Sequence, residues 1–364
     1  MPAPHEPRRG ARRALMAAVG LLVSAVAVGY LLWGLRGAWG GLWEALKGAD
    51  YLYVVPSVAL LAAVYVVRIV RWRLLLKPVK DVPYSAVASA TAIGFMSSCV
   101  LPLRPGEVIR PYVLHRKAGV SFGDAVGTAM GLERVFDLIG VCFMVFATLL
   151  LMAGGGADGE FVGRLEDAAV WFAALAGLGL AGLGALAFFP NRLLGLASLL
   201  MRPLPQALRT RLLEFAGSIV GSMRALRSPG RVAAAALLSF AIWSMFPLST
   251  YALSRAFDLD IPFLGALVVQ VCVTAAVVAP QAPGFIGPFH VATMEAVKLF
   301  GVSEAGAGAF ALTLWAVNVV PITVVGLAFL RHEGLNLLRL ARASERAAAG
   351  AEPAAGEDAK AREA

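Results

Sequence analysis

Apolar residues along this 364-residue chain come in long blocks that alternate with short polar segments. An α-helix needs roughly 20 consecutive apolar residues to cross about 30 Å of hydrocarbon. Six stretches have this character: 14–35, 51–71, 122–152, 168–189, 231–253 and 304–330. The pattern therefore predicts an all-α integral membrane protein with six transmembrane helices.

Two further apolar stretches are broken by proline and glycine. Residues 84–101 lead into Pro102-Leu103-Arg104-Pro105-Gly106-Glu107, and residues 262–279 lead into a similar break at 280–288. If 84–101 crossed fully, every later segment would be inverted and basic loops would lie outside. We therefore predict two re-entrant helical hairpins, at 84–117 and 262–300.

The two hairpins share sequence signals in the same order. These signals are P-x-x-P-G at 102–106 and 280–284, and G-V-S at 119–121 and 301–303. A crossing precedes each hairpin and a long helix follows it, so residues 51–152 (repeat A) and 231–330 (repeat B) are two similar units of opposite orientation. Such an inverted-topology repeat is the architecture of many transporters.

Arginine and lysine are distributed unevenly between the predicted loops. The N-terminal residues 1–13 and the connection 190–230 are basic and are expected in the cytoplasm, whereas the acidic segment 153–167 is expected outside. The basic residues that close the second helix indicate the same orientation: Arg68, Arg71, Arg73, Lys77 and Lys80. We expect a protein of the cell inner membrane with both termini in the cytoplasm.

The regions outside the crossings have distinct compositions. The connection 190–230 is predicted to form amphipathic helices on the inner leaflet. The tail 336–364 is rich in alanine and charged residues, and we expect it to be disordered. One membrane domain, 14–335, remains between the basic N-terminus and this tail.

The composition supports a membrane protein and argues against nucleic-acid binding. Only 15% of the residues are charged, against about 25% in average soluble domains, and the mean hydropathy is +0.76. The net charge of +9 is confined to segments between helices, which indicates membrane orientation rather than a nucleic-acid surface. Cys99, Cys142 and Cys272 lack metal-ligand spacing, so we expect no metal and no other cofactor.

Charged residues at the tip of the first hairpin predict an anion site. The second half of this hairpin begins near Gly106, so its N-terminal end points into the membrane, with Arg104 beside it and Arg110 one turn in. A helix N-terminus and an arginine together favour an anion such as a lipid phosphate. The alternative is that Arg104 and Arg110 only extend to the inner interface.

The helix predicted at 122–152 carries three charges within the membrane. Each charge costs roughly 2.5–3.5 kcal/mol at a helix centre, so Glu133, Arg134 and Asp137 need partners. Glu133 and Asp137 share a face, Arg134 can pair with Asp137, and Glu107 at the hairpin tip is the nearest further partner. The cluster is a candidate substrate-binding site, and the alternative is an ion-pair network that stabilises the fold.

Repeat B offers fewer charges. Its candidate substrate-binding residues are Pro283, Gly284, Gly287 and His290, around the second hairpin tip. Proline and glycine at membrane depth leave backbone groups unpaired, which is tolerable only beside protein or a water-filled cavity. A lone buried histidine is more often a satisfied core residue than a ligand, and this alternative stays open for His290.

These motifs resemble those of a known family. The residues that carry the resemblance are Arg68-x-x-Arg71-Trp72, Leu101-Pro102-x-Arg104-x-Gly106-Glu107-x-x-Arg110, Glu133-Arg134-x-x-Asp137 and the Pro-Gly-x-x-Gly at 283–287. Over about residues 14–335 the chain is similar to the flippase-like membrane domain of lysylphosphatidylglycerol synthases. The resemblance implies lipid translocation, of which the aminoacylated phosphatidylglycerol flippase is an example.

The chain departs from the family pattern in three respects. It has no soluble aminoacyl-transferase domain, so the resemblance does not imply synthesis of lysyl lipid. His290 stands where many relatives have a glutamate, and Ser97, Ser98 and Cys99 stand where an asparagine often precedes the Leu-Pro motif. These departures concern the substrate more than the fold.

The leading hypothesis is a flippase or carrier for an anionic membrane phospholipid or an isoprenoid-linked lipid. The alternative is a membrane-embedded enzyme that acts on polyprenyl phosphate or another lipid phosphate, with Glu107 and Glu133 as candidate bases and Ser97 and Ser98 nearby. A transporter of soluble solutes is less favoured, because few polar residues lie outside the two hairpins. A second copy of the chain and a separate lipid-modifying enzyme remain open as partners.

Overall fold

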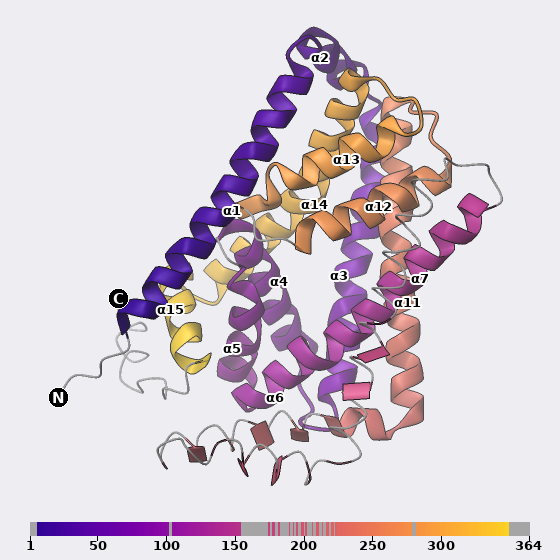
Figure 1. The fold of residues 1–364 in the computed structure, drawn as a ribbon. Helices are drawn as coiled ribbons and strands as arrows, with labels where there is room; N and C mark the ends of the chain where they lie inside the picture. Colours follow the sequence, from indigo (N-terminus) through magenta and orange to yellow (C-terminus); the bar gives the residue numbers. More distant parts are fainter. Residues whose placement is uncertain are drawn as a thin grey trace.

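The computed structural model of this chain describes residues 6–101, 104–153, 223–278 and 282–348, and scattered residues between 174 and 221. Every regular element in this part of the chain is a helix, and the longest helices run side by side (Figure 1). The predicted all-α class is confirmed for these residues.

Four helical segments are long and apolar enough to cross a membrane. They are Tyr51–Leu76, Phe122–Leu151, Pro229–Phe257 and Glu304–His332. A fifth candidate is the pair formed by α1 (Glu6–Leu35) and α2 (Trp39–Gly48), between which the chain bends by 90°. The predicted crossing at 168–189 lies largely outside the described residues.

The first unit follows the order that its sequence predicts. Its elements are η1 (Tyr51–Tyr53), α3 (Val54–Leu76), α4 (Tyr84–Val100), α5 (Gly106–Ala118), α6 (Phe122–Val126), η2 (Gly127–Leu132) and α7 (Glu133–Ala153). At 17 residues α4 is shorter than a full crossing, and α5 returns beside it as a hairpin. The two helices pack closely, because a Cβ on Gly106 would overlap the carbonyl oxygen of Gly94 and the hydroxyl of Ser98.

The second unit repeats this order. Its elements are η3 (Met223–Arg227), α11 (Pro229–Ser254), η4 (Arg255–Phe257), α12 (Phe263–Val278), η5 (Pro283–Phe285), α13 (Pro288–Lys298) and α14 (Glu304–His332). Here α12 has 16 residues, and α13 returns beside it.

The G-V-S motifs have the same structural role in both units. Gly119 and Gly301 have positive φ angles of 58° and 80°, a region that glycine reaches without a steric penalty. Two residues later, Oγ of Ser121 accepts a hydrogen bond from N of Asp124, and Oγ of Ser303 accepts one from N of Gly306. Each motif therefore ends a hairpin and caps the long helix that follows.

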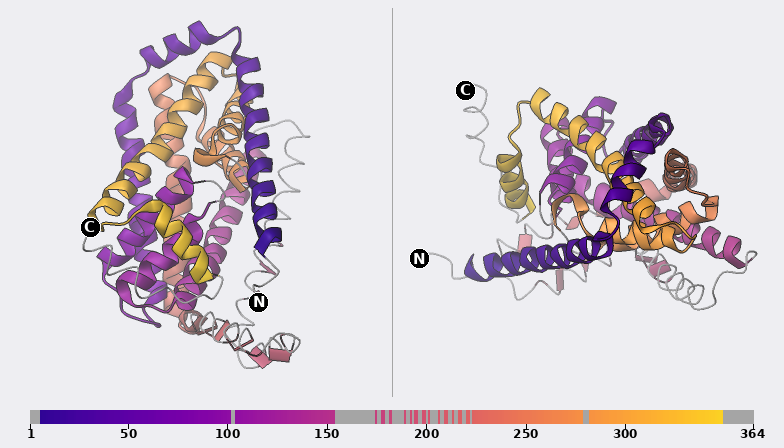
Figure 2. Two further views of the ribbon diagram at one scale, coloured as in Figure 1. Left: turned by 90° about the vertical axis from the view of Figure 1, so that its left-hand side faces the viewer. Right: turned by 90° about the horizontal axis from the view of Figure 1, so that it is seen from above.

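The two hairpins occupy opposite halves of the molecule. The α4–α5 hairpin fills the lower half of Figure 1 and the α12–α13 hairpin the upper half, so their tips point toward each other. Helices of the two units also pack against each other: α4 against α14, α12 against α7, and α3 along α11. Figure 2 shows α2 crossing over the end of α14, against which it packs.

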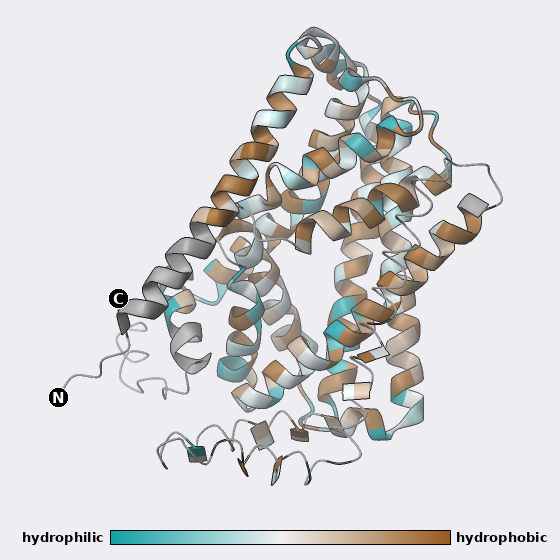
Figure 3. Cartoon of the chain, viewed as in Figure 1, coloured by the Kyte–Doolittle hydropathy of each residue, from teal (hydrophilic) through white to brown (hydrophobic). Residues whose placement is uncertain are grey.

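The outer surface of the bundle is apolar. Large apolar side chains that are more than half exposed occur on α1, α3, α7, α11 and α14, among them Leu22, Val55, Phe146, Leu237 and Val324. Figure 3 shows this hydrophobic colouring along the long helices, with a hydrophilic patch on the lower part of α3. Exposed aromatic residues gather where α1, α2 and η1 meet, as expected at a membrane interface: Tyr30, Trp33, Trp39, Trp43, Tyr51 and Tyr53.

The C-terminal segment differs from its prediction. We expected disorder from residue 336, but Leu337–Ala348 form α15, which packs against α5. Oδ1 of Asn336 caps this helix by accepting from N of Leu338 and N of Arg339, and Leu340 is buried beneath it. Alanine and arginine are good helix formers, and Leu337, Leu340 and Ala341 add apolar contacts with the first hairpin. Residues 349–364 lie outside the described part.

Candidate functional site

Two arginines project from one face of α3 into the interior. Arg68 and Arg71 are three positions apart, which places their side chains on the same side of the helix. They are 9% and 0% exposed, respectively. Because an arginine keeps its charge when buried, each must find acceptors inside the protein.

The acceptors come from α7. Nη2 of Arg71 lies 2.8 Å from Oδ1 of Asp137 and 3.5 Å from Oε1 of Glu133. Nη1 of Arg68 lies 3.2 Å from Oδ2 of Asp137. The preceding segment, η2, is wound as a π-helix, a form that is frequent next to functional sites.

A third buried arginine reaches the same carboxylates from the first hairpin. Nη1 of Arg110, on α5, lies 2.5 Å from Oε2 of Glu133, and its Nη2 lies 3.3 Å from Oγ1 of Thr91 on α4. The guanidinium also stacks over the ring of Trp72 at 3.9 Å from the centroid. The cluster thereby ties the hairpin to α3 and α7.

The second unit completes the cluster through α11. Nη1 of Arg71 donates to Oγ of Ser239 across 2.6 Å, and Nε1 of Trp243 donates to Oδ1 of Asp137 across 3.4 Å. Trp243 can approach this closely because Gly140 of α7 leaves room; a Cβ there would overlap the indole. Five helices from both units (α3, α4, α5, α7 and α11) thus meet at one set of charges.

The cluster carries more positive than negative charge. Three arginines (Arg68, Arg71 and Arg110) face two carboxylates (Glu133 and Asp137), a surplus of one positive charge among the buried residues that the structure describes. In addition, Nε of Arg71 and Nε of Arg110 are buried without a hydrogen-bond partner. Unused donors and unbalanced positive charge are the properties that an anion would satisfy.

Glu107 and Arg134 form a separate, more exposed pair. Nη2 of Arg134 lies 2.5 Å from Oε1 of Glu107, and the two side chains are 54% and 33% exposed. The expected pairing of Arg134 with Asp137 is therefore wrong, because Arg68 and Arg71 occupy Asp137 instead. The expected proximity of Glu107 to the charges of α7 is confirmed.

Arg104 joins the tips of the two hairpins. Its Nη2 donates to the carbonyl oxygen of Val277 at the end of α12, and its guanidinium lies 5.0 Å from the ring centroid of Phe285. Both residues have positive φ angles, 52° for Arg104 and 60° for Phe285. Such strained backbone costs of order 1–3 kcal/mol per residue and occurs mostly at functional sites.

The candidate residues of the second hairpin shape its tip rather than join the charged cluster. Pro283 starts η5, and Gly284 and Gly287 have φ angles of 74° and 100°. Gly287 also lets α1 approach, since a Cβ there would lie 2.9 Å from the carbonyl oxygen of Ser24. His290 is buried on the first turn of α13.

The N-terminus of α5 contributes less than the sequence suggested. N of Glu107, N of Val108 and N of Ile109 already donate to the carbonyl oxygens of Arg104 and Pro105. The close packing of α5 on α4 explains why residue 106 is a glycine. An anion at this tip would therefore be held by guanidinium groups more than by backbone amides.

Sequence reasoning missed several members of the cluster. Arg68 and Arg71 were interpreted only as orientation signals and as part of a family motif, although their spacing of three places them on one face. Ser239, Trp243 and Thr91 gave no signal, because a single polar residue in an apolar helix has many explanations. Of the five basic residues that close the second helix, Arg73, Lys77 and Lys80 then remain as orientation signals.

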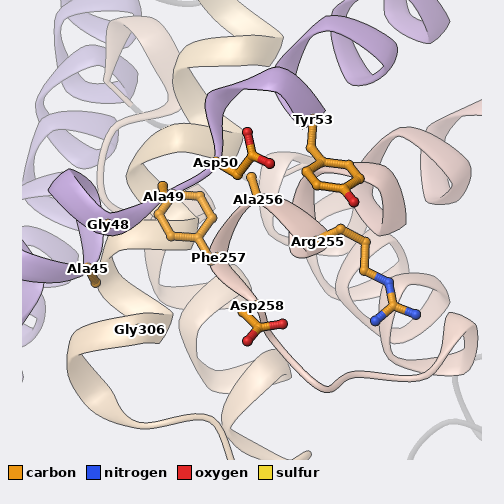
Figure 4. A pocket seen from close by; sticks show the side chains of 10 residues that line it. All are labelled: Ala45, Gly48, Ala49, Asp50, Tyr53, Arg255, Ala256, Phe257, Asp258 and Gly306. Carbon is orange, nitrogen blue, oxygen red and sulfur yellow. The ribbon is translucent and has the colours of Figure 1, made fainter.

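An open hollow of about 430 Å³ lies far from this cluster. It forms where the α2–α3 and α11–α12 connections meet, and Asp50, Tyr53, Arg255 and Asp258 line it (Figure 4). The 18 residues between Tyr53 and Arg71 span about 27 Å of helix, so the hollow lies at the opposite end of α3. No group of His, Cys, Asp or Glu that could hold a metal ion occurs within the described residues.

Comparison with known proteins identifies the membrane part of the chain. Residues 17–326 match the family model described as the lysylphosphatidylglycerol synthase TM region. Comparison with curated proteins gives no match. The matched range contains every residue of the buried cluster.

Proposed function

Because the chain belongs to the family of the lysylphosphatidylglycerol synthase TM region, we propose that it is a flippase or carrier that moves an anionic lipid across the cell inner membrane. The lipid is a phospholipid or an isoprenoid-linked lipid. Its phosphate binds in the region that Arg104, Arg110 and Arg134 surround, while its acyl or prenyl chains stay against the apolar outer surface.

The buried surplus of positive charge carries this proposal. Burying charge in a membrane protein is costly, so intramembrane ionisable residues face the interior and commonly mark substrate pathways. A network that served stability alone would do best with balanced charges. The cluster instead has one arginine more than it has carboxylates, and two of its guanidinium nitrogens have no acceptor.

The arrangement of the helices supports an inverted repeat with six crossings. In Figure 1, α3 descends and α11 rises, and the two hairpins open toward opposite ends. The sixth crossing, predicted at 168–189, lies largely outside the described residues. In this topology α1 begins, and α14 ends, on the same side as the α4–α5 hairpin, which we assign to the cytoplasm.

A route between the hairpins follows from the side chains at their tips. Phe95 lies under Arg68 and Arg110, with both guanidinium groups 5.4 Å from its ring centroid. It packs with Phe285 and Trp315 in one apolar cluster that also contains Tyr65. Phe95, Phe285 and Trp315 thus border the same apolar cluster, and we place the route of the headgroup from the arginines to the second hairpin along it.

The geometry favours transport over lipid-phosphate chemistry. Glu133 is held by Arg71 and Arg110, and Glu107 is held by Arg134, so each candidate base already has a cationic partner. Oγ of Ser97 donates to the carbonyl oxygen of Ile93 across 2.6 Å and is not paired with a base.

Reconstitution tests the proposal. Purified protein in proteoliposomes should bring fluorescent phosphatidylglycerol into contact with an added membrane-impermeant quencher faster than this occurs in protein-free vesicles. Fluorescent phosphatidylcholine should reach the quencher more slowly than phosphatidylglycerol does. Equal rates with and without protein would refute the proposal. Release of inorganic phosphate from a polyprenyl phosphate would favour the enzyme instead.

A further inference from the structure

His290 is a buried polar side chain that lacks a full set of partners. It lies on the first turn of α13 and is 6% exposed, and its Nδ1 has no hydrogen-bond partner. Its ring lies 6.0 Å from that of Phe289 and 5.7 Å from that of Trp315, centroid to centroid. Most buried polar atoms in proteins are hydrogen-bonded, so an open nitrogen in this position calls for a ligand or a proton.

The tip of the second hairpin connects His290 to Arg104. Nε1 of Trp315 donates to the carbonyl oxygen of Gly284 across 2.5 Å, and Phe285 stacks against the Arg104 guanidinium. A chain of contacts through Trp315, Gly284 and Phe285 thus links His290 to Arg104. Phe285 has a φ angle of 60°, and such strained backbone in a residue other than glycine occurs mostly at functional sites.

Among the described residues of α13 and of the helices that pack against it, no unpaired carboxylate balances an imidazolium at His290. On α13 itself, Glu295 and Lys298 pair with each other, and Glu295 also accepts from Tyr30 of α1. The other charges of α1 lie in its first turns, and the titratable side chain of α12 is Cys272. The charges of α14 lie at its two ends: Glu304, Arg331 and His332. A protonated His290 would therefore be an uncompensated charge among apolar rings, and the resting side chain is neutral.

We propose that His290 is a second binding station for the lipid phosphate, and that it takes up one proton when the phosphate arrives. This inference rests on the proposed function. The lone pair of the imidazole nitrogen accepts a proton from water, the resulting N–H donates to a phosphate oxygen, and the proton returns to water when the headgroup leaves. No bond of the lipid is broken.

The coupling follows from thermodynamic linkage. An anion beside the ring supplies the charge that the imidazolium lacks, so bound phosphate favours bound proton, and bound proton favours bound phosphate to the same extent. The two stations therefore differ in kind, since the first hairpin offers permanently charged arginines and the second offers a charge that exists only with the substrate. Anion and proton occupy the second hairpin as a neutral pair.

Calorimetry of lipid binding tests the proposal. The probe is dioctanoylphosphatidylglycerol, a phosphodiester whose own charge is constant near neutral pH, added to the full-length protein in a non-ionic detergent. Titrations in buffers of different ionisation enthalpy give the number of protons taken up. With lipid added until both stations are filled, we expect about one proton taken up per wild-type protein above about pH 7, where free imidazole is neutral. We expect none for His290→Gln or His290→Asn, and His332→Gln, at the exposed end of α14, should behave as the wild type.

Each outcome has a defined meaning. Wild-type binding without proton uptake would overturn this inference and leave the proposed lipid function standing. Proton uptake that persists in both His290 variants would also overturn it. A wild-type protein that binds no anionic lipid at any pH would remove the proposed function and this inference together. Unchanged melting temperatures of the two variants exclude misfolding as the cause of a lost proton.

Discussion

Nη2 of Arg71 lies 2.8 Å from Oδ1 of Asp137, and the Arg71 side chain is completely buried. This contact joins α3 to α7, and the second guanidinium nitrogen reaches Ser239 on α11. A single arginine therefore links three long helices through charge-assisted hydrogen bonds, which are roughly twice as strong as neutral ones.

Arg71→Ala should destabilise the fold strongly. The substitution leaves Asp137 and Glu133 with one cationic partner each, in a setting that solvent does not reach. The lost hydrogen bonds join Arg71 to Asp137, Glu133 and Ser239, and hydrogen bonds to charged groups contribute about 1.5–3 kcal/mol each, so we expect a loss of about 3 kcal/mol or more. Thermal unfolding in detergent measures the effect. Lys77 is an exposed residue just past the end of the same helix, and Lys77→Ala should change the stability by no more than about 0.5 kcal/mol. An equal loss of stability in the two variants would contradict the argument from burial.

Gly94→Ala should disturb the first hairpin. The new Cβ would lie 2.5 Å from Cβ of Arg110, so α5 must shift and Arg110 must lose its contact with Glu133. We expect a lower melting temperature and weaker binding of anionic lipid. Gly29→Ala is the matched control, because nothing lies within 4 Å of a Cβ there. The Gly29→Ala substitution should be neutral or stabilise α1 by up to about 1 kcal/mol. A Gly94→Ala protein with the wild-type melting temperature and lipid binding would count against the close packing of the hairpin.

Arg134→Ala should separate function from stability. Its pair with Glu107 is largely exposed, and such pairs contribute about 0–1 kcal/mol. The melting temperature should therefore change little, while translocation of anionic lipid slows because the proposed phosphate-binding region loses one of its three arginines. Glu107→Gln provides the opposite change, since it frees Arg134, and should leave translocation unchanged or faster. Equal slowing by both substitutions would mean that the pair matters only as a pair.

Glu333 gives the fold a defined dependence on pH. It follows α14 and accepts hydrogen bonds from Lys117 of α5 and Ser89 of α4. Burial raises the pKa of Glu333, but the two hydrogen bonds outweigh this effect, so its pKa lies below the usual 4.5. Because the folded-state pKa is depressed, the stabilisation is complete above about pH 4.5 and is lost as the pH falls through the folded-state value.

Glu333→Gln tests this dependence. The variant should melt below the wild type near neutral pH, and the difference should shrink as the pH falls below about 4.5. Melting curves at several pH values measure it. A difference that is the same at all pH values would show that Glu333 acts through packing rather than through its charge.

The positions of the helices were predictable, whereas the directions of their side chains were not. Proline, glycine and the G-V-S motifs mark both hairpins within one or two residues, because backbone restrictions act locally. By contrast, hydropathy cannot distinguish an arginine buried in the inner part of a helix, such as Arg71, from one at the interface. The spacing within α7 also does not reveal that Asp137 pairs with Arg68 and Arg71 of α3, which leaves Arg134 to pair with Glu107.

The tail shows the same limit. Its composition is compatible with a solvated coil or with a helix, and the contact of Leu340 with the first hairpin decides between them. Long-range contacts of this kind carry no local sequence signal. The cross-unit partners Ser239 and Trp243 escaped prediction for the same reason.

The central claim is that arginines at the meeting point of the hairpins handle a lipid phosphate, and the rate of anionic-lipid translocation by Arg104→Ala in proteoliposomes tests it most directly. The account predicts a loss of at least about tenfold, equivalent to about 1.4 kcal/mol, in a protein with the wild-type melting temperature. Arg104→Lys should retain part of the rate, because it keeps the charge but loses the planar fork. Arg36→Ala, at an exposed arginine between α1 and α2, should match the wild type. Wild-type translocation by correctly folded Arg104→Ala would contradict the account.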